Sequence, residues 1–136
     1  MHILVVDDSR VIRRAAFKIL EKEFSVLEAE DGVDAWKQIQ ENKSISVVFS
    51  DLGMPNMDGY ELLEKIRSSD NLAIARLPVI IITGAEESDG AKQKVFEHGA
   101  TDFITKPFDS IALRTRAHAH IKYRSEVHSL EQRVAT

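Results

Sequence analysis

Short apolar runs alternate along the chain with segments in which apolar residues recur every three or four positions. Three of the runs are continuous, at residues 3–6, 47–49 and 79–82. Such runs are typical of strands that are buried on both faces of a sheet. Two less apolar runs, at residues 25–29 and 102–105, predict a second and a fifth strand.

The segments between these runs have the spacing of amphipathic helices. Ser9 is a suitable N-cap for the first helix, and Asp58 with Glu61 has the form of a capping box for the third. A fourth helix is weaker, because Gly90 interrupts it and Gly99 ends it. A last helix is expected from about residue 109 to the end. The core-facing positions are predicted to be Val11, Ile12, Ala15, Ala16, Ile19 and Leu20, then Val33, Trp36 and Ile39, then Leu62, Leu63 and Ile66.

Five alternations of strand and helix predict a parallel sheet with helices on both faces, because right-handed crossovers place helices on each side. The expected fold is α/β, a flavodoxin-like three-layer sandwich around a five-stranded parallel sheet. The three continuous runs would be its central strands, which fits the strand order 2-1-3-4-5. No linker or internal repeat divides the 136 residues, so one domain is expected.

Composition narrows the class of protein. The chain has no cysteine, which excludes disulfides, thiolate metal sites and cysteine nucleophiles. No apolar run reaches the length of a membrane span, and the amino terminus lacks the pattern of a secretion signal, so a cytoplasmic location is expected. A formal net charge of −4 argues against non-specific binding of nucleic acid.

Acidic residues follow two of the predicted central strands. Asp7 and Asp8 follow the first, and Asp51 ends the third. In the 2-1-3-4-5 order these strands are neighbours where the strand order reverses, which is where open parallel sheets bind ligands. Asp51 alone could simply cap a turn. Three converging carboxylates, however, repel one another unless a cation neutralises them, and oxygen ligands select a hard ion, so a Mg²⁺ site is predicted.

Two more residues are expected at the same edge, Thr83 after the fourth strand and Lys106 after the fifth. A hydroxyl and an ammonium are suited to phosphate oxygens, and together with Mg²⁺ they would stabilise charge during phosphoryl transfer. Asp51 is then the natural nucleophile, since a carboxylate can form an aspartyl phosphate without a separate base. Taken singly, Lys106 would be a solvated charge.

Together these motifs resemble the receiver domain of response regulators in two-component signalling, including chemotaxis regulators. The resemblance covers residues 3–113. The residues that carry it are the pair Asp7-Asp8, the segment 50–59 around Asp51, Thr83-Gly84, Phe103 and the segment Lys106-Pro107-Phe108.

The resemblance implies metal and phosphoryl roles at the sheet edge. Asp51 would be the phospho-acceptor, and Asp8 would bind Mg²⁺ directly. Asp7 would bind it through water, and the backbone carbonyl of Gly53 would be a further ligand. Lys106 would bind the phosphoryl group, with a cis peptide bond to the proline that follows it.

The resemblance also implies a switch rather than an enzyme for external substrates. Thr83 and Phe103 would form the switch pair, although Phe103 could equally be ordinary core. Phosphorylation would change the face built from the fourth helix, the fifth strand and the last helix. The phosphoryl group would come from a sensor histidine kinase or a histidine phosphotransfer protein, because no segment here has the form of a phosphodonor histidine. The output domain or effector stays open.

Three other functions fit parts of the same pattern. A Mg²⁺-dependent phosphatase of the haloacid dehalogenase type needs a second Asp two positions after the nucleophile, where this chain has Gly53. A flavin-binding module would need a phosphate loop after the first strand, where Asp7 and Asp8 would repel the phosphate. A phosphorylation-independent, receiver-like adaptor is the remaining alternative.

The last helix is longer than the family requires. Residues 1–120 are expected to form the receiver domain and residues 121–136 an extension of its last helix. Tyr123, Val127, Leu130 and Val134 follow the 4-3-4 spacing of a coiled-coil seam. This predicts a homodimer through a stalk to a missing output domain, and the alternative is a solvated amphipathic end. The basic residues of this helix predict a solvated face rather than a nucleic-acid site.

Overall fold

The fold is a parallel sheet between two layers of helices. The computed structural model describes the backbone of residues 1–84 and 89–135, and the side chains of these residues apart from 89, 91 and 123–135. The sheet has the order β2-β1-β3-β4-β5, and every adjacent pair is parallel. Its strands are β1 (His2–Val6), β2 (Ser25–Ala29), β3 (Ile45–Asp51), β4 (Val79–Gly84) and β5 (Asp102–Lys106). The predicted flavodoxin-like fold and strand order are confirmed.

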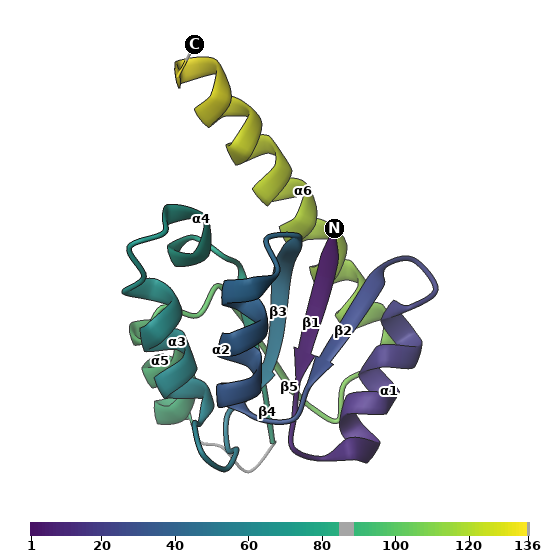
Figure 1. Cartoon of the computed structure of the whole chain (residues 1–136). Helices are drawn as coiled ribbons and strands as arrows, with labels where there is room; N and C mark the ends of the chain where they lie inside the picture. Colours follow the sequence, from purple (N-terminus) through teal and green to yellow (C-terminus); the bar gives the residue numbers. More distant parts are fainter. Residues whose placement is uncertain (85–88, 136) are drawn as a thin grey trace.

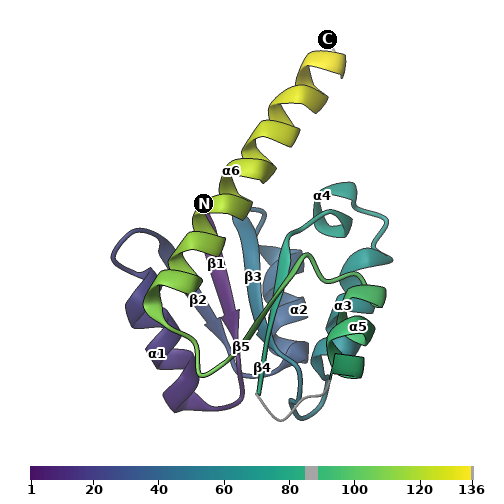
Figure 2. The same ribbon diagram turned by 180° about the vertical axis from the view of Figure 1, so that it is seen from behind.

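Helices cover both faces of this sheet (Figures 1 and 2). The helices are α1 (Arg10–Leu20), α2 (Gly32–Glu41), α3 (Gly59–Arg67), α4 (Leu72–Ala75), α5 (Asp89–Glu97) and α6 (Ser110–Ala135). One buried core joins the sheet to α2, α3 and α5, and a second joins it to α1 and α6. The arrows of β1, β2 and β3 point toward the lower edge in Figure 1, and because every adjacent pair is parallel, every strand delivers its carboxyl end to that edge.

Burial and capping explain why the sheet edge is well defined. Residues 45–50 of β3 and residues 79–83 of β4 are all buried, as continuous apolar runs predict for central strands. The Ser9 hydroxyl accepts from the Ile12 N–H at 3.4 Å, and the Asp58 carboxylate accepts from the Glu61 N–H at 2.9 Å. With these caps, α1 begins at Arg10 after residues 7–9, and α3 begins at Gly59 after the longer loop of residues 52–58.

Some predictions about the helices were wrong. Val11 is 81% exposed, Val33 is 50% exposed and Ala15 is exposed as well, although all three were expected to face the core. Val11 and Val33 lie in the first turns of α1 and α2, whereas Ala35 and Ile39 further along α2 are buried. Helix α4 was not predicted, because four residues, Leu72–Ala75, are too few to show a helical period.

The last helix runs unbroken from Ser110 to Ala135 and rises past the amino edge of the sheet (Figures 1 and 2). Asp109 precedes it and accepts from the Ala112 N–H at 2.6 Å. Leu113 and Ala117 are buried against the core under α1. The seam predicted from Tyr123, Val127, Leu130 and Val134 lies outside the side chains that the structure describes.

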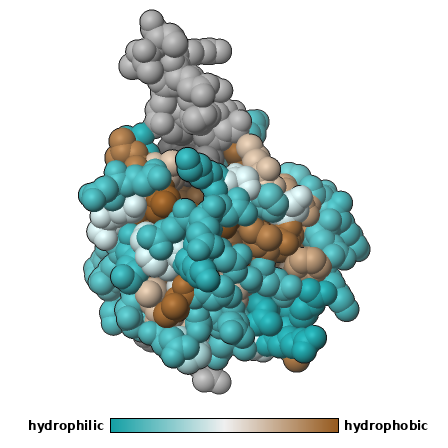
Figure 3. All heavy atoms as spheres, viewed as in Figure 1, coloured by the Kyte–Doolittle hydropathy of each residue, from teal (hydrophilic) through white to brown (hydrophobic). Residues whose placement is uncertain are grey.

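The surface seen in Figure 3 is mostly hydrophilic, with hydrophobic residues in separate patches. Exposed apolar residues of this kind are normal for a globular domain. Within residues 1–84 and 89–135, no helix combines the length and the apolar character that a membrane crossing needs.

Candidate functional site

The turn after β1 brings two acidic residues to the carboxyl edge of the sheet. The Asp7 N–H donates to the Ala29 carbonyl at 3.1 Å, which continues the pairing of β1 with β2. The Asp7 carboxylate is buried and accepts from the Ser9 N–H at 2.8 Å. Asp8 is exposed, so one acid of the pair points into the protein and the other remains open to solvent.

Asp51 meets this turn from the neighbouring strand β3, and Lys106 reaches it from β5 at the edge of the sheet. The Lys106 Nζ lies 3.2 Å from Asp7 Oδ2 and 3.2 Å from Asp51 Oδ1, so one ammonium bridges two carboxylates. Asp51 Oδ1 also accepts from the Leu52 N–H at 2.9 Å. One oxygen each from Asp7, Asp8 and Asp51 lie within 4.8 Å of one another. The structure therefore brings together the three acids and the lysine that the sequence placed at this edge.

The charges at this site are not balanced. Burial raises the pKa of the Asp7 carboxyl, and the negative charge of Asp51 raises it further. The hydrogen bond from the Ser9 N–H and the positive charge of Lys106 lower it, but burial is the largest influence and the pKa stays above its usual value. Burial also acts to lower the pKa of Lys106, but Asp51 and Asp7 outweigh it, so this pKa lies above its usual range. Lys106 is thus held as a cation, and the three carboxylates with this one ammonium leave two negative charges uncompensated.

This donor set fits a small divalent cation. The candidate ligands are carboxylate oxygens, which hard ions such as Mg²⁺ prefer, and the two uncompensated negative charges match the charge of such an ion. Because Asp8 and Gly53 are exposed, the metal would retain access to water and to an incoming phosphate. The predicted Mg²⁺ ion thus has a suitable group of residues.

Thr83 and Phe103 lie on one face of the sheet. Thr83 is buried and pairs with Thr105 of β5, while Phe103 pairs with Ile81. Because paired residues and those two apart share a face, both side chains lie on the face that α5 covers. The half-buried Phe103 ring lies 6.5 Å from the Phe96 ring of α5. Phe103 therefore adjoins α5, and Thr83 lies two positions nearer the acidic edge.

The loop after Asp51 is shaped by close backbone contacts. A Cβ on Gly59 would lie 2.7 Å from the Asp51 carbonyl oxygen, so only glycine fits there. Asn56 adopts a positive φ of 66°, and its amide donates to Asp31 Oδ2 at 2.8 Å. Gly53, the proposed carbonyl ligand, has open space around its Cα. The Lys106–Pro107 peptide bond is cis, as the resemblance implied.

Sequence reasoning missed one residue that touches this site. Arg13 Nη1 donates to the Asp7 carbonyl at 2.8 Å, and Arg13 Nε donates to Glu28 of β2 at 3.2 Å. The signal available in the sequence was a pair of arginines one helical turn after the acidic pair. That signal does not distinguish a solvated face from a specific contact.

Comparisons with known proteins agree on one family. The sequence profile described as the response regulator receiver domain matches residues 3–118. The chain is similar to chemotaxis protein CheY1 of Helicobacter pylori, with 36% identity over 121 residues that cover 85% of this chain and 93% of that protein.

Solved structures give the same result. The signal receiver domain of a putative LuxO repressor protein from Vibrio parahaemolyticus aligns with a TM-score of 0.84 and 27% identity, covering 96% of each chain. A probable two-component system response regulator/GGDEF domain protein aligns with a TM-score of 0.82 and 28% identity, covering 92% of this chain and 50% of that one.

Proposed function

The chain belongs to the response regulator receiver domain family, and we propose that it is a signalling switch that Asp51 phosphorylation turns on. The observation that carries this proposal is the Lys106 ammonium, 3.2 Å from both Asp51 and Asp7 at the exposed end of the sheet. It sits where a phosphoryl group on Asp51 would bring negative charge.

The reaction follows from the nucleophile and its neighbours. A carboxylate oxygen of Asp51 attacks the phosphorus of the donor, a phosphorus–oxygen or phosphorus–nitrogen bond breaks, and the leaving group departs with that electron pair. An aspartyl phosphate forms, and Lys106 and the Thr83 hydroxyl interact with its oxygens. The protein thus catalyses only its own phosphorylation and dephosphorylation. The donor would be a sensor histidine kinase or a histidine phosphotransfer protein, in the cytoplasm.

We assign the Mg²⁺ ion to Asp7, Asp8, Asp51 and the Gly53 carbonyl. When bound, the ion supplies positive charge that offsets the repulsion between these acids and the incoming phosphoryl group. Lys106, at the end of β5, supplies one further positive charge. Its raised pKa keeps it protonated at neutral pH. The Ser9 N–H holds the Asp7 carboxylate in place, so this acid would already be positioned when the ion binds.

The output face would be α5, β5 and α6. Thr83 would move toward the phosphoryl oxygens, and Phe103 would change rotamer against Phe96 of α5. Helix α5 is suited to such a shift, because Val95 is buried while Phe96 beside it is 42% exposed. Identical amide hydrogen exchange of residues 89–108 in the two phosphorylation states would contradict this part of the proposal.

The central experiment is phosphorylation by acetyl phosphate, followed by intact-mass spectrometry. We expect one added phosphoryl group on the wild-type protein, only with Mg²⁺ present, and none on Asp51→Asn. Asp58→Asn is the matched control, because Asn retains the helix cap and should leave labelling unchanged. Equal labelling of Asp51→Asn and the wild type would refute the proposal.

The extension of α6 would be a dimeric stalk that carries the switch to an output domain. The 4-3-4 spacing of apolar residues after Lys122 supports this proposal. The similar response regulator/GGDEF domain protein also supports it, because the alignment covers only half of that longer chain. A chain ending at Lys122 retains the contact between His120 and Asp102 and is the fair comparison. Sedimentation should give a dimer for the full chain only, and a monomeric full chain in both phosphorylation states would exclude the stalk.

A further inference from the structure

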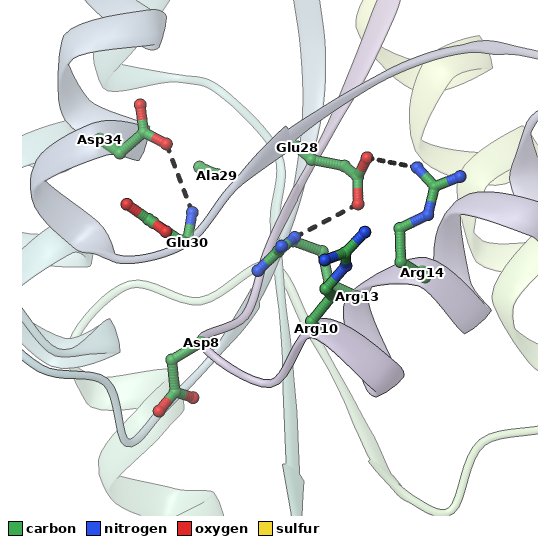
Figure 4. A pocket seen from close by; sticks show the side chains of 8 residues that line it. All are labelled: Asp8, Arg10, Arg13, Arg14, Glu28, Ala29, Glu30 and Asp34. Carbon is green, nitrogen blue, oxygen red and sulfur yellow. Dashed lines mark hydrogen bonds and ion pairs between the residues drawn. The ribbon is translucent and has the colours of Figure 1, made fainter.

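A charged cleft of about 560 Å³ lies beside the acidic turn, between α1 and the end of β2 (Figure 4). Arg13, Arg14 and Glu28 lie along it, with Asp8 at its rim. Arg13 Nε lies 3.2 Å from Glu28 Oε1, and Arg14 Nη1 lies 2.7 Å from Glu28 Oε2. Each carboxylate oxygen of Glu28 therefore has one guanidinium partner.

Arg13 also makes a contact that Arg14 does not share. Its Nη1 donates to the Asp7 carbonyl oxygen at 2.8 Å. This oxygen belongs to the peptide bond between Asp7 and Asp8. The Arg13 side chain is only 16% exposed, so this contact is largely shielded from water. The Arg13 guanidinium thus bonds to Glu28 through Nε and to the backbone of the acidic turn through Nη1.

The exposed acid of the pair depends on this backbone. Among the residues that the structure describes, the Asp8 carboxylate accepts no hydrogen bond. Figure 4 shows it pointing away from the arginines. No side-chain contact within the described part of the chain holds the Asp8 carboxylate, so the backbone that carries it, including the peptide that precedes it, decides where it can reach, whereas Asp7 is held by its own side-chain contacts with Ser9 and Lys106.

We propose that Arg13, oriented by Glu28, is a positioning residue that fixes the Asp7–Asp8 peptide and so aims the Asp8 carboxylate at the cation site. The proposal rests on the proposed function, since it concerns the Mg²⁺ affinity of that site. Arginine is required because its planar fork presents two donors in fixed directions, while lysine offers one charge on a flexible stem. Partners of this kind typically change metal affinity about 10-fold to 100-fold when removed.

The sign of the effect separates positioning from electrostatics. Arg13 carries positive charge beside the turn that bears Asp7 and Asp8, so removing that charge alone should tighten the binding of a cation. A loss of Mg²⁺ affinity in an Arg13 variant would then come from the lost orientation of Asp8. A purely structural ion pair would lower the unfolding temperature and leave the affinity of the folded protein unchanged.

The experiment is titration calorimetry with Mg²⁺ on the full chain, with thermal unfolding measured in parallel. We expect Arg13→Met to weaken Mg²⁺ binding about tenfold, with a smaller loss for Arg13→Lys and for Glu28→Gln. Arg14→Met is the control: it removes a similar charge and a contact with Glu28 but does not touch Asp7, and its affinity should stay within about twofold.

Each outcome decides something. Unchanged or tighter binding by Arg13→Met, with wild-type binding intact, would overturn the positioning role and leave the proposed function standing. If Arg13→Met does not fold, wild-type affinity in both Arg13→Lys and Glu28→Gln would overturn it equally. A wild-type chain that neither binds Mg²⁺ nor becomes phosphorylated would remove both proposals.

Discussion

The two edges of the parallel sheet bury charge in different ways. At the carboxyl edge, Asp7, Asp8 and Asp51 share one ammonium, from Lys106, and their charges do not balance. Near the amino edge, the partly buried guanidinium of Arg67, at the end of α3, is surrounded by neutral oxygens. It donates to the carbonyls of Gly99, Ala75 and Leu77 and to the hydroxyl of Thr101.

The difference separates a stabilising site from a binding site. Burial lowers the pKa of Arg67, yet a guanidinium remains charged in proteins, so its cost of burial is offset by hydrogen bonds alone. These bonds tie α3 to α4 and to the segments just before β4 and β5, and they engage the guanidinium donors within the protein, although none of these partners is an acid. At the carboxyl edge, by contrast, three carboxylates repel one another, so a cation or a phosphoryl group can change the energy of that edge by a large amount.

The largest expected effect is the loss of the Arg67 contacts. Arg67→Met would leave three partly buried carbonyl oxygens without this donor, each at about 1–3 kcal/mol, so we expect the free energy of unfolding to fall by about 3–5 kcal/mol. Urea denaturation measures it. Lys65→Met, on the exposed side of the same helix turn, should cost less than about 0.5 kcal/mol. A loss of less than about 1 kcal/mol for Arg67→Met would mean that water replaces its contacts and that the two edges do not differ as described.

A smaller effect of opposite sign is expected at the carboxyl edge. Asp7→Asn removes one of three like charges, and after the lost attraction to Lys106 is subtracted we expect a gain of about 1 kcal/mol at neutral pH. Because the pKa of Asp7 is raised in the folded protein, wild-type stability is reduced at neutral pH and recovers as pH falls through that pKa. The difference between the two proteins should therefore vanish below pH ~4.

The control for this prediction is Asp58→Asn, an acid whose role as a helix cap Asn can keep. It should change stability little at neutral pH. If Asp7→Asn is less stable than the wild type at neutral pH, the ion pair with Lys106 outweighs the repulsion, and the carboxyl edge is balanced after all.

The sequence predicts the arrangement of the carboxyl edge well, because that arrangement depends on strand order and on the residues that end each strand. Continuous apolar runs identified β1, β3 and β4 as central. The acids directly after β1 and at the end of β3 then had to lie side by side. Knowing the order of the strands was enough to bring Asp7, Asp8 and Asp51 together.

The amino edge and the neighbourhood of Arg13 could not be predicted in this way. The partners of Arg67 are mostly backbone carbonyls, which any residue type supplies, so the sequence holds no trace of them. The contact of Arg13 with the Asp7 carbonyl is of the same kind. The exposure of Val11 and Val33 could not be predicted either. Helical periodicity predicts which side of a helix faces the sheet, but not how far along the helix the sheet extends to cover it.

The smallest expected effect concerns Asp102, at the amino end of β5. Its Oδ2 lies 3.0 Å from His120 Nε2 and 3.3 Å from Arg116 Nε, so it connects the sheet to the base of the α6 extension. Burial raises the pKa of Asp102, but the His120 hydrogen bond, the Phe103 N–H and the charge of Arg116 outweigh it, and the pKa lies below its usual range. Stability from this group is therefore present above pH ~4 and is lost as pH falls through the folded-state pKa.

Asp102→Asn should lower the free energy of unfolding by less than about 1 kcal/mol at neutral pH, as is usual for partly exposed ion pairs. The deficit should shrink as pH falls below ~4, because the wild-type carboxyl then becomes neutral as well. Asp7→Asn gives the reverse, a gain at neutral pH that disappears in acid, so two Asp-to-Asn substitutions at opposite edges should produce curves of opposite sign. Asp70→Asn, at an exposed position, is the control for the substitution itself. Curves of the same sign for Asp7 and Asp102, measured by urea denaturation across this pH range, would show that burial, and not the choice of partners, governs both carboxyls.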